Sequence, residues 1–180
     1  MSFKENYTQK ILPELAKELG IDNPMQIPRI EKIVINMGIG SYVASGHKDF
    51  SSLKNDLALI AGQLPRINHA RLSISNFKLR EGMPVALMVT LRGKTMYGFV
   101  KKLVSVILPR VRDFRGLSNK AFDGVGNYSI GLKEQTVFPE IRQDDDIMIH
   151  GLQVTFSTTA KTDKEGFALL KHVGLPFQKK

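Results

Sequence analysis

Hydrophobic residues recur with helical spacing in four parts of the chain. Near the start they follow one another at intervals of four: Phe3, Tyr7, Ile11, Leu15 and Leu19. This spacing places apolar side chains on one face of a helix, and Gly20 stands where the pattern stops. Thr95 is typical of a helix-capping residue, and Thr162-x-x-Glu165 is a capping box. The full pattern predicts helices over residues 3–19, 45–62, 95–108 and 162–173.

Alternating apolar and polar residues predict strands between these helices. The expected strands cover residues 30–37, 72–74, 85–91, 128–132 and 149–159. Each has one apolar face, and the order of elements lacks the strict βαβ alternation of a doubly wound fold. We therefore expect an α+β two-layer sandwich, a mainly antiparallel sheet with helices on one face. Asn36, Thr90 and Gln153 would lie on its open face, available to a ligand.

The length and composition narrow the possibilities. A chain of 180 residues without repeats or linkers predicts a single domain over 1–180. The absence of cysteine excludes disulfides, thiolate metal sites and cysteine nucleophiles. Residues 1–10 do not resemble a signal peptide, and no apolar run is long enough to span a membrane. We expect a cytoplasmic protein.

Positive charge is concentrated in one third of the chain. The net charge is +9, and residues 66–120 hold twelve basic residues against two acidic ones. The rest of the chain is close to neutral, so the positive electrostatic potential arises from this one region. Such a concentration of charge favours a polyanionic partner. Arginines outnumber lysines there, and their planar guanidinium groups suit bidentate contacts with phosphate.

Short matches to catalytic and cofactor motifs are incomplete. Gly38 and Gly40 begin a dinucleotide fingerprint, but Val43 occupies the third glycine position. Leu132 stands where a Walker A loop needs lysine, and Tyr97 and Phe99 have helical rather than strand spacing. The histidines are isolated in sequence: His47, His69, His150 and His172. We expect no cofactor, no metal and no catalytic residues, and keep an enzyme acting on a phosphorylated or RNA substrate as the alternative.

RNA is favoured over DNA because no recognition-helix pattern is present and the basic residues fall mostly on expected loops. Phe77 lies among cations in the segment 76–84, where it could stack on an unpaired base. The alternative for Phe77 is a side chain folded inward beneath a solvated loop.

Six segments occur in an order that resembles a known family. They are INMGIG (35–40), SNFKLREGMP (75–84), VTLRG (89–93), LPRVRDFRGL (108–117), FDGVGNY (122–128) and FPEI (138–141). The family is the bacterial large-subunit ribosomal protein five, which binds 5S rRNA. The resemblance covers nearly the whole chain.

The resemblance implies a ribosome-bound structural protein in the central protuberance of the large subunit. Its partners would be 5S rRNA, 23S rRNA, the peptidyl-site tRNA, other central-protuberance proteins and a basic small-subunit protein. The implied 5S rRNA contacts are Asn36, Gln63, Thr90 and Arg92. A protruding basic loop at about 75–83 would face tRNA with Asn76, Phe77, Lys78 and Arg80.

Two further contact groups complete these expectations. Arg110, Arg112 and Arg115 would serve other rRNA phosphates. The acidic run Asp144, Asp145 and Asp146, where the resemblance is weakest, would face the basic small-subunit protein across the subunit interface. Gly38 and Gly40 would form a tight turn that lets the backbone approach RNA.

Overall fold

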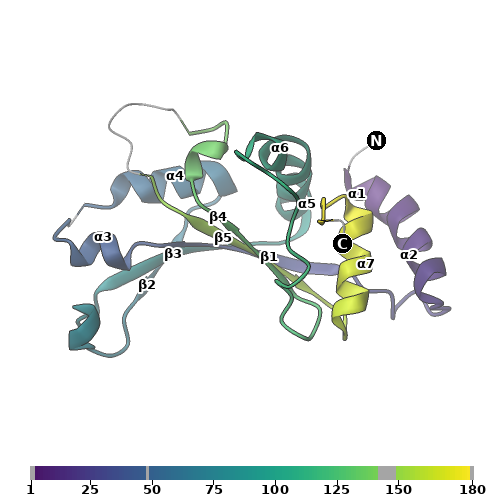
Figure 1. Ribbon diagram of the computed structural model, residues 1–180, viewed down its shortest axis with the longest axis horizontal. Coiled ribbons are helices and arrows are strands. Elements are labelled where there is room, and N and C mark those ends of the chain that lie inside the picture. The colour runs from purple at the N-terminus through teal and green to yellow at the C-terminus, as the bar shows by residue number, and fades with distance from the viewer. Residues whose placement is uncertain (1–2, 48, 142–148, 179–180) are drawn as a thin grey trace. The chain divides into compact units, whose positions relative to one another are not determined.

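The computed structural model describes residues 3–47, 49–141 and 149–178 (Figure 1). This part of the chain divides into two compact units, each built from separate stretches of sequence. The terminal unit comprises Met1–Ile33, Leu91–Ile130 and Thr155–Lys180, and the central unit comprises Val34–Thr90 and Gly131–Val154. The single-domain organisation expected from the sequence stays a prediction.

Among the described residues, five strands form one open antiparallel sheet in the order β2-β3-β1-β5-β4. The strands are β1 (Ile30–Gly38), β2 (Arg66–His69), β3 (Pro84–Leu91), β4 (Tyr128–Leu132) and β5 (Leu152–Thr158). Alternate residues are buried, as Ile33, Ile35 and Met37 are on β1. Their neighbours on β1 are more exposed, which leaves the other face of the sheet less covered. The predicted α+β sandwich is confirmed.

Helices in the terminal unit come from the middle of the sequence as well as from its two ends. The first run consists of α1 (Phe3–Asn6), the π-helical η1 (Tyr7–Ile11) and α2 (Leu12–Leu19), and Gly20 ends it in the left-handed conformation. The second run consists of α5 (Gly93–Lys102), the π-helical η3 (Leu103–Ile107) and α6 (Leu108–Arg110). α1 packs against α5, and α2 packs against α7 (Asp163–Val173), as Figure 1 shows.

Two predicted helix limits in the terminal unit are wrong. The helix predicted to start at Thr95 begins at Gly93, with Arg92 as its N-cap. The Thr95 hydroxyl instead donates a hydrogen bond to the Arg92 carbonyl, at 2.8 Å. The same run continues one residue past Pro109 and ends at Arg110, the last residue of α6. The Thr162 half of the capping box is confirmed, because its side chain accepts a hydrogen bond from the Glu165 N–H. The Glu165 carboxylate accepts from the Lys161 N–H, one residue before the N-cap.

The central unit holds α3 (Gly40–Ala44), α4 (Ser51–Ala61) and the 3₁₀ turns η2 (Ser75–Phe77) and η4 (Gln135–Val137). The helix predicted from residue 45 begins at Ser51, because the Asp49 carboxylate accepts a hydrogen bond from the Ser51 N–H and organises its first turn. The predicted strand at 72–74 is also wrong. Ile74 forms an isolated bridge with Leu79, while the strand in this region is β2.

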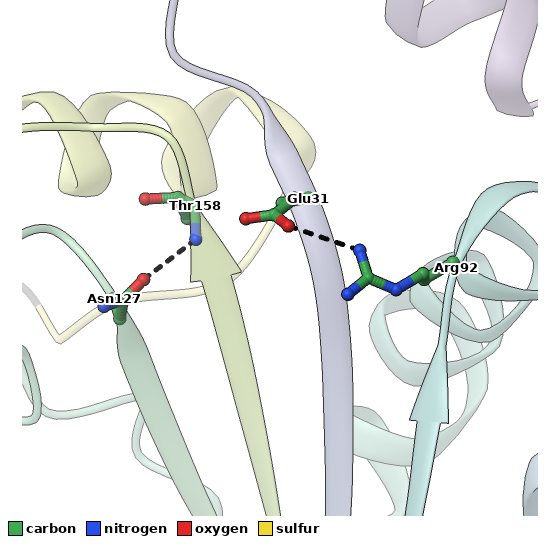
Figure 2. Close-up of polar contacts among 4 residues, drawn as sticks. All are labelled: Glu31, Arg92, Asn127 and Thr158. Atoms are coloured by element: carbon green, nitrogen blue, oxygen red, sulfur yellow. Dashed lines mark hydrogen bonds and ion pairs between the residues drawn. The ribbon is translucent and has the colours of Figure 1, made fainter.

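A tight turn at residues 123–127 packs against α7 within the terminal unit. The Asp123 carboxylate accepts hydrogen bonds from the Val125 and Asn127 backbones and from Asn127 Nδ2. These bonds lower the pKa of Asp123 below its ordinary value, the Asn127 side chain contributing most. Asn127 Oδ1 in turn accepts from the Thr158 N–H at 2.9 Å (Figure 2). The turn therefore ties the start of β4 to the end of β5.

Candidate nucleic-acid interface

The basic side chains of residues 66–120 lie on the surface of both units. The central unit presents Arg66, Arg71, Lys78 and Arg80, all exposed. The terminal unit presents Arg92, Lys94, Lys101, Lys102, Arg110, Arg112, Arg115 and Lys120, of which Lys102 is half-buried and the rest exposed. Each unit can therefore offer cations to a polyanion from its own surface.

Asn36 and Thr90 lie on one face of the sheet in the central unit. β1 and β3 are neighbours, and on each strand the buried positions alternate with these partly exposed ones. Because the buried residues share the covered face, Asn36 and Thr90 share the other. An amide and a hydroxyl can both donate and accept hydrogen bonds, which suits recognition of an irregular RNA surface.

Two residues of β2 extend this face, and sequence reasoning missed them. Arg66 pairs with Met88 across the β2/β3 ladder, two positions from Thr90 on the same side. Asn68 donates from Nδ2 to the Met88 sulfur, at 3.9 Å. A strand of four residues is too short to show a clear alternation of apolar and polar positions. The place of Arg66 and Asn68 on this face therefore follows only from the pairing of β2 with β3. We call Asn36, Arg66, Asn68 and Thr90 the central face.

Gln63 does not belong to the central face. It follows Gly62, the left-handed residue that ends α4, and is exposed in the connection to β2. Leu64 beside it is 74% exposed, so this connection is a surface with both polar and apolar character.

The segment 70–83 is a closed loop fastened by its own hydrogen bonds. The Ala70 N–H donates to the Met83 carbonyl and the Gly82 N–H to the Ala70 carbonyl, at 2.8 and 3.0 Å. Nearer the tip, Ile74 and Leu79 exchange backbone hydrogen bonds of 3.0 and 3.1 Å. The loop that the sequence predicted at 75–83 is thus the outer part of a longer hairpin-like projection.

The tip of this loop exposes both cationic and apolar side chains. The Phe77 ring is 69% exposed, which excludes the alternative in which it folds inward. Lys78 adopts φ 53°, a left-handed conformation that is unusual for a residue with a side chain. Asn76 and Arg80 are exposed as well. The loop therefore presents an aromatic ring on a segment that also carries two exposed cations, a combination that can stack on a base and bind phosphate.

Arg92 stands at the junction of β3 and α5, in the terminal unit. Its Nη1 lies 3.2 Å from Glu31 Oε1, and both side chains remain about half exposed (Figure 2). Arg92 is also the N-cap of a ten-residue helix, whose first N–H groups favour a nearby anion. The sequence did not show the contact with Glu31 because 61 positions separate the two residues.

The remaining predicted contact residues lie on the terminal unit or outside the described residues. Arg110 is the last residue of α6, and Arg112 and Arg115 follow it in an exposed loop, so the three are close in sequence on the terminal unit. Asp144, Asp145 and Asp146 lie outside the described residues.

Gly38 and Gly40 lie where the chain changes from β1 to α3. Gly38 is the last residue of β1 and Gly40 the first of α3, and neither has a positive φ. The change of direction needs no left-handed residue, and the approach of this backbone to RNA stays a prediction. Tyr97 and Phe99 lie on α5 rather than on a strand, which confirms the helical spacing, and Phe99 is buried in the core.

Two histidines have structural surroundings. The backbone N–H of His150 donates a hydrogen bond to Oε1 of buried Gln135. Burial lowers the pKa of the His150 imidazole. His172 on α7 contacts the Glu14 and Glu18 carboxylates of α2, acidic partners that local spacing could not reveal. Among the described residues, no group of three His, Cys, Asp or Glu side chains could hold a metal ion. No helix within the same residues is long and apolar enough to cross a membrane.

Comparison with known proteins identifies relatives along almost the entire chain. Residues 23–80 match the family model described as ribosomal protein L5, and residues 84–177 match the model of the C-terminus of the same ribosomal family. The large ribosomal subunit protein uL5 of Anaeromyxobacter sp. (strain K) is 54% identical over 175 residues, covering 97% of each chain. The uL5 protein of Desulforapulum autotrophicum is 54% identical over 177 residues, covering 98% of each.

A third bacterium carries a similar protein. The uL5 protein of Brevibacillus brevis is 52% identical over 176 residues, covering 98% of this chain and 97% of its own. Because these relatives are named as ribosomal proteins, the prediction of a ribosomal component rather than an enzyme is confirmed. The chain belongs to the ribosomal protein L5 family of the large ribosomal subunit.

Proposed function

We propose that this protein binds 5S rRNA through the central face together with Gln63 and Arg92, and so helps attach that RNA to the central protuberance of the large subunit. The observation that carries the proposal is the placement of Asn36 and Thr90 on the less covered side of neighbouring strands. Short polar groups held on a sheet recognise shape and hydrogen-bonding pattern, while exposed arginines bind phosphates.

The tip of loop 70–83 would contact the peptidyl-site tRNA. Its support is the exposed Phe77 ring beside Lys78 and Arg80. A ring stacks on an unpaired base, and cations neutralise the phosphates around it. Arg110, Arg112 and Arg115 would bind 23S rRNA phosphates, and Asp144–Asp146 would meet the basic small-subunit protein. The protein would act in the cytoplasm, bound to the ribosome.

The test is a titration of the purified protein with 5S rRNA, with a tRNA and a plain RNA duplex as competitors, at two salt concentrations. We expect 5S rRNA to bind selectively and to retain that selectivity at the higher salt, because hydrogen bonds to a shaped surface do not depend on counterion release. Equal binding to all three RNAs that disappears at the higher salt would refute the proposal.

Variants then test the individual residues. Asn36→Ala and Thr90→Ala should each weaken 5S rRNA binding by about 1 kcal/mol, the value of one hydrogen bond. Arg92→Gln should cost about 1–3 kcal/mol and make the salt dependence shallower by about one phosphate contact. Lys17→Gln, which removes an exposed charge from α2 outside the basic segment, is the matched control and should leave selectivity unchanged. Normal binding by Asn36→Ala, Thr90→Ala and Arg92→Gln alike would reject this set of contacts.

A further inference from the structure

The contact between Glu31 and Arg92 is unusual because it joins an acid to the cation expected to bind RNA. Glu31 is the second residue of β1, and Arg92 directly follows β3, the neighbouring strand. Both residues belong to the terminal unit. A carboxylate beside an RNA-binding arginine repels phosphate by its charge, so it needs a compensating reason to be there.

The geometry of the contact leaves most of the guanidinium group outside it. Glu31 Oε1 meets Arg92 at Nη1, 3.2 Å away. Arginine has five N–H donors in a planar fork, and the two nitrogens not in this contact carry the remaining edge of that fork. Figure 2 shows these two nitrogens away from the dashed contact. A phosphate can therefore approach one edge while the carboxylate occupies the other.

Both partners are anchored at the backbone. Glu31 lies within β1 between buried Ile30 and Ile33. Arg92 has the extended conformation of a helix N-cap, and its carbonyl accepts the Thr95 hydroxyl. The flexible parts are thus the two side chains, and the longer one, Arg92, loses rotamer freedom whenever it is held in one orientation. An ion pair formed before RNA arrives removes part of that loss from the binding step.

We propose that Glu31 is a positioning residue for RNA binding: it holds the Arg92 guanidinium with its second edge turned outward, ready for a phosphate. This inference rests on the proposed function, because it requires Arg92 to contact RNA. It makes a prediction opposite to that of charge alone. Removing the Glu31 charge should weaken binding of the specific RNA, although the protein becomes more positive.

The experiment compares Glu31→Gln, Arg92→Gln and the double variant, each titrated with 5S rRNA and with a plain RNA duplex. We expect Glu31→Gln to weaken 5S rRNA binding about two- to fivefold, the range available from an exposed ion pair. Duplex binding should be unchanged or tighter, since it depends on total charge. In the Arg92→Gln background, Glu31→Gln should no longer weaken 5S rRNA binding, because no guanidinium is left to position.

Asp22→Asn is the charge-matched control, since Asp22 is exposed in the terminal unit before β1 and is not the partner of Arg92. This substitution should not weaken the binding of either RNA. Melting curves establish that each variant is folded. Unchanged or tighter 5S rRNA binding by Glu31→Gln, with Arg92→Gln impaired, would overturn the positioning role and leave the proposed function intact. Unimpaired binding by Arg92→Gln would overturn both the contact at Arg92 and the role of Glu31.

Discussion

Replacing Gly166 with alanine tests how closely α7 approaches the turn at 123–127. A methyl group at Gly166 would lie 2.5 Å from the Gly126 carbonyl oxygen and 3.0 Å from its Cα. Both are backbone atoms and cannot rotate away. The Gly126 N–H is also bonded to Asp163, and its carbonyl accepts the Thr158 hydroxyl at 2.8 Å. The turn is therefore held in place at the point where alanine would need it to move.

The sign of the effect opposes helix propensity. Alanine is favoured over glycine inside a helix by about 1 kcal/mol. Overpacking costs about 1–3 kcal/mol, and occasionally more, when neighbours cannot relax. Because contact with three backbone atoms of Gly126 puts this site at or above the upper end, we expect Gly166→Ala to lower the free energy of unfolding by about 2 kcal/mol net. The melting temperature should fall by about 4–8 °C.

Gly98→Ala is the control, because Gly98 lies inside α5 with open space around the added methyl group. This substitution should stabilise by about 1 kcal/mol and raise the melting temperature by about 2–4 °C. Urea unfolding followed by far-ultraviolet circular dichroism measures both, and equal slopes for all variants validate the comparison. If Gly166→Ala stabilises the protein as Gly98→Ala does, the close approach at Gly126 is wrong.

Three further predictions concern other parts of the fold. Burial raises the pKa of Tyr7 and of Tyr128 from 10.0 to about 12. When ionisation is followed by phenolate absorbance, these two rings should ionise at a higher pH in the folded protein than in the denatured protein. Because the folded-state pKa is raised, their stabilisation is complete below about pH 10 and is lost as the pH rises through about 12; equal titration of folded and denatured protein would contradict this. Thr162→Ala should cost about 1 kcal/mol of unfolding free energy, since the side chain caps α7; an unchanged urea midpoint would show that the cap contributes nothing. Phe77→Ala should change the free energy of unfolding by less than about 0.5 kcal/mol, because the side chain is exposed. A larger loss would mean that Phe77 packs against the rest of the protein, which contradicts its exposure.

Local periodicity predicted those elements whose apolar face is long enough to read. β1 and β3 alternate over eight or more residues, and both were predicted to within one residue at each end. β2 has four residues and half-buried rather than buried positions, so it carries no clear pattern. The start of α4 was misplaced because it is set by a local hydrogen bond, from the Ser51 N–H to the Asp49 carboxylate, and not by apolar spacing.

The candidate site depends more on pairing between distant segments than on local pattern. Asn36 and Thr90 were predictable from alternation and from resemblance, whereas Arg66 and Asn68 become visible only through the β2/β3 register. The Glu31 contact with Arg92 spans 61 positions, and nothing in either local sequence specifies it. Exposure of Phe77 likewise depends on how loop 70–83 closes on itself, through the bonds of Ala70 and Ile74.

The packing of α2 against α7 has a consequence for how the chain folds while it is being made. His172 and Glu18 are 154 positions apart, so the first helix run leaves the synthesising ribosome long before its partner exists. At about 5–20 residues per second, the wait is about 8 to 30 seconds. Leu15 is buried in the folded protein, on a helix that gains α7 as a neighbour only after that helix has been made. During this interval a nascent chain of this protein therefore carries α2 without its α7 partner, and the terminal unit cannot close until α7 has been made.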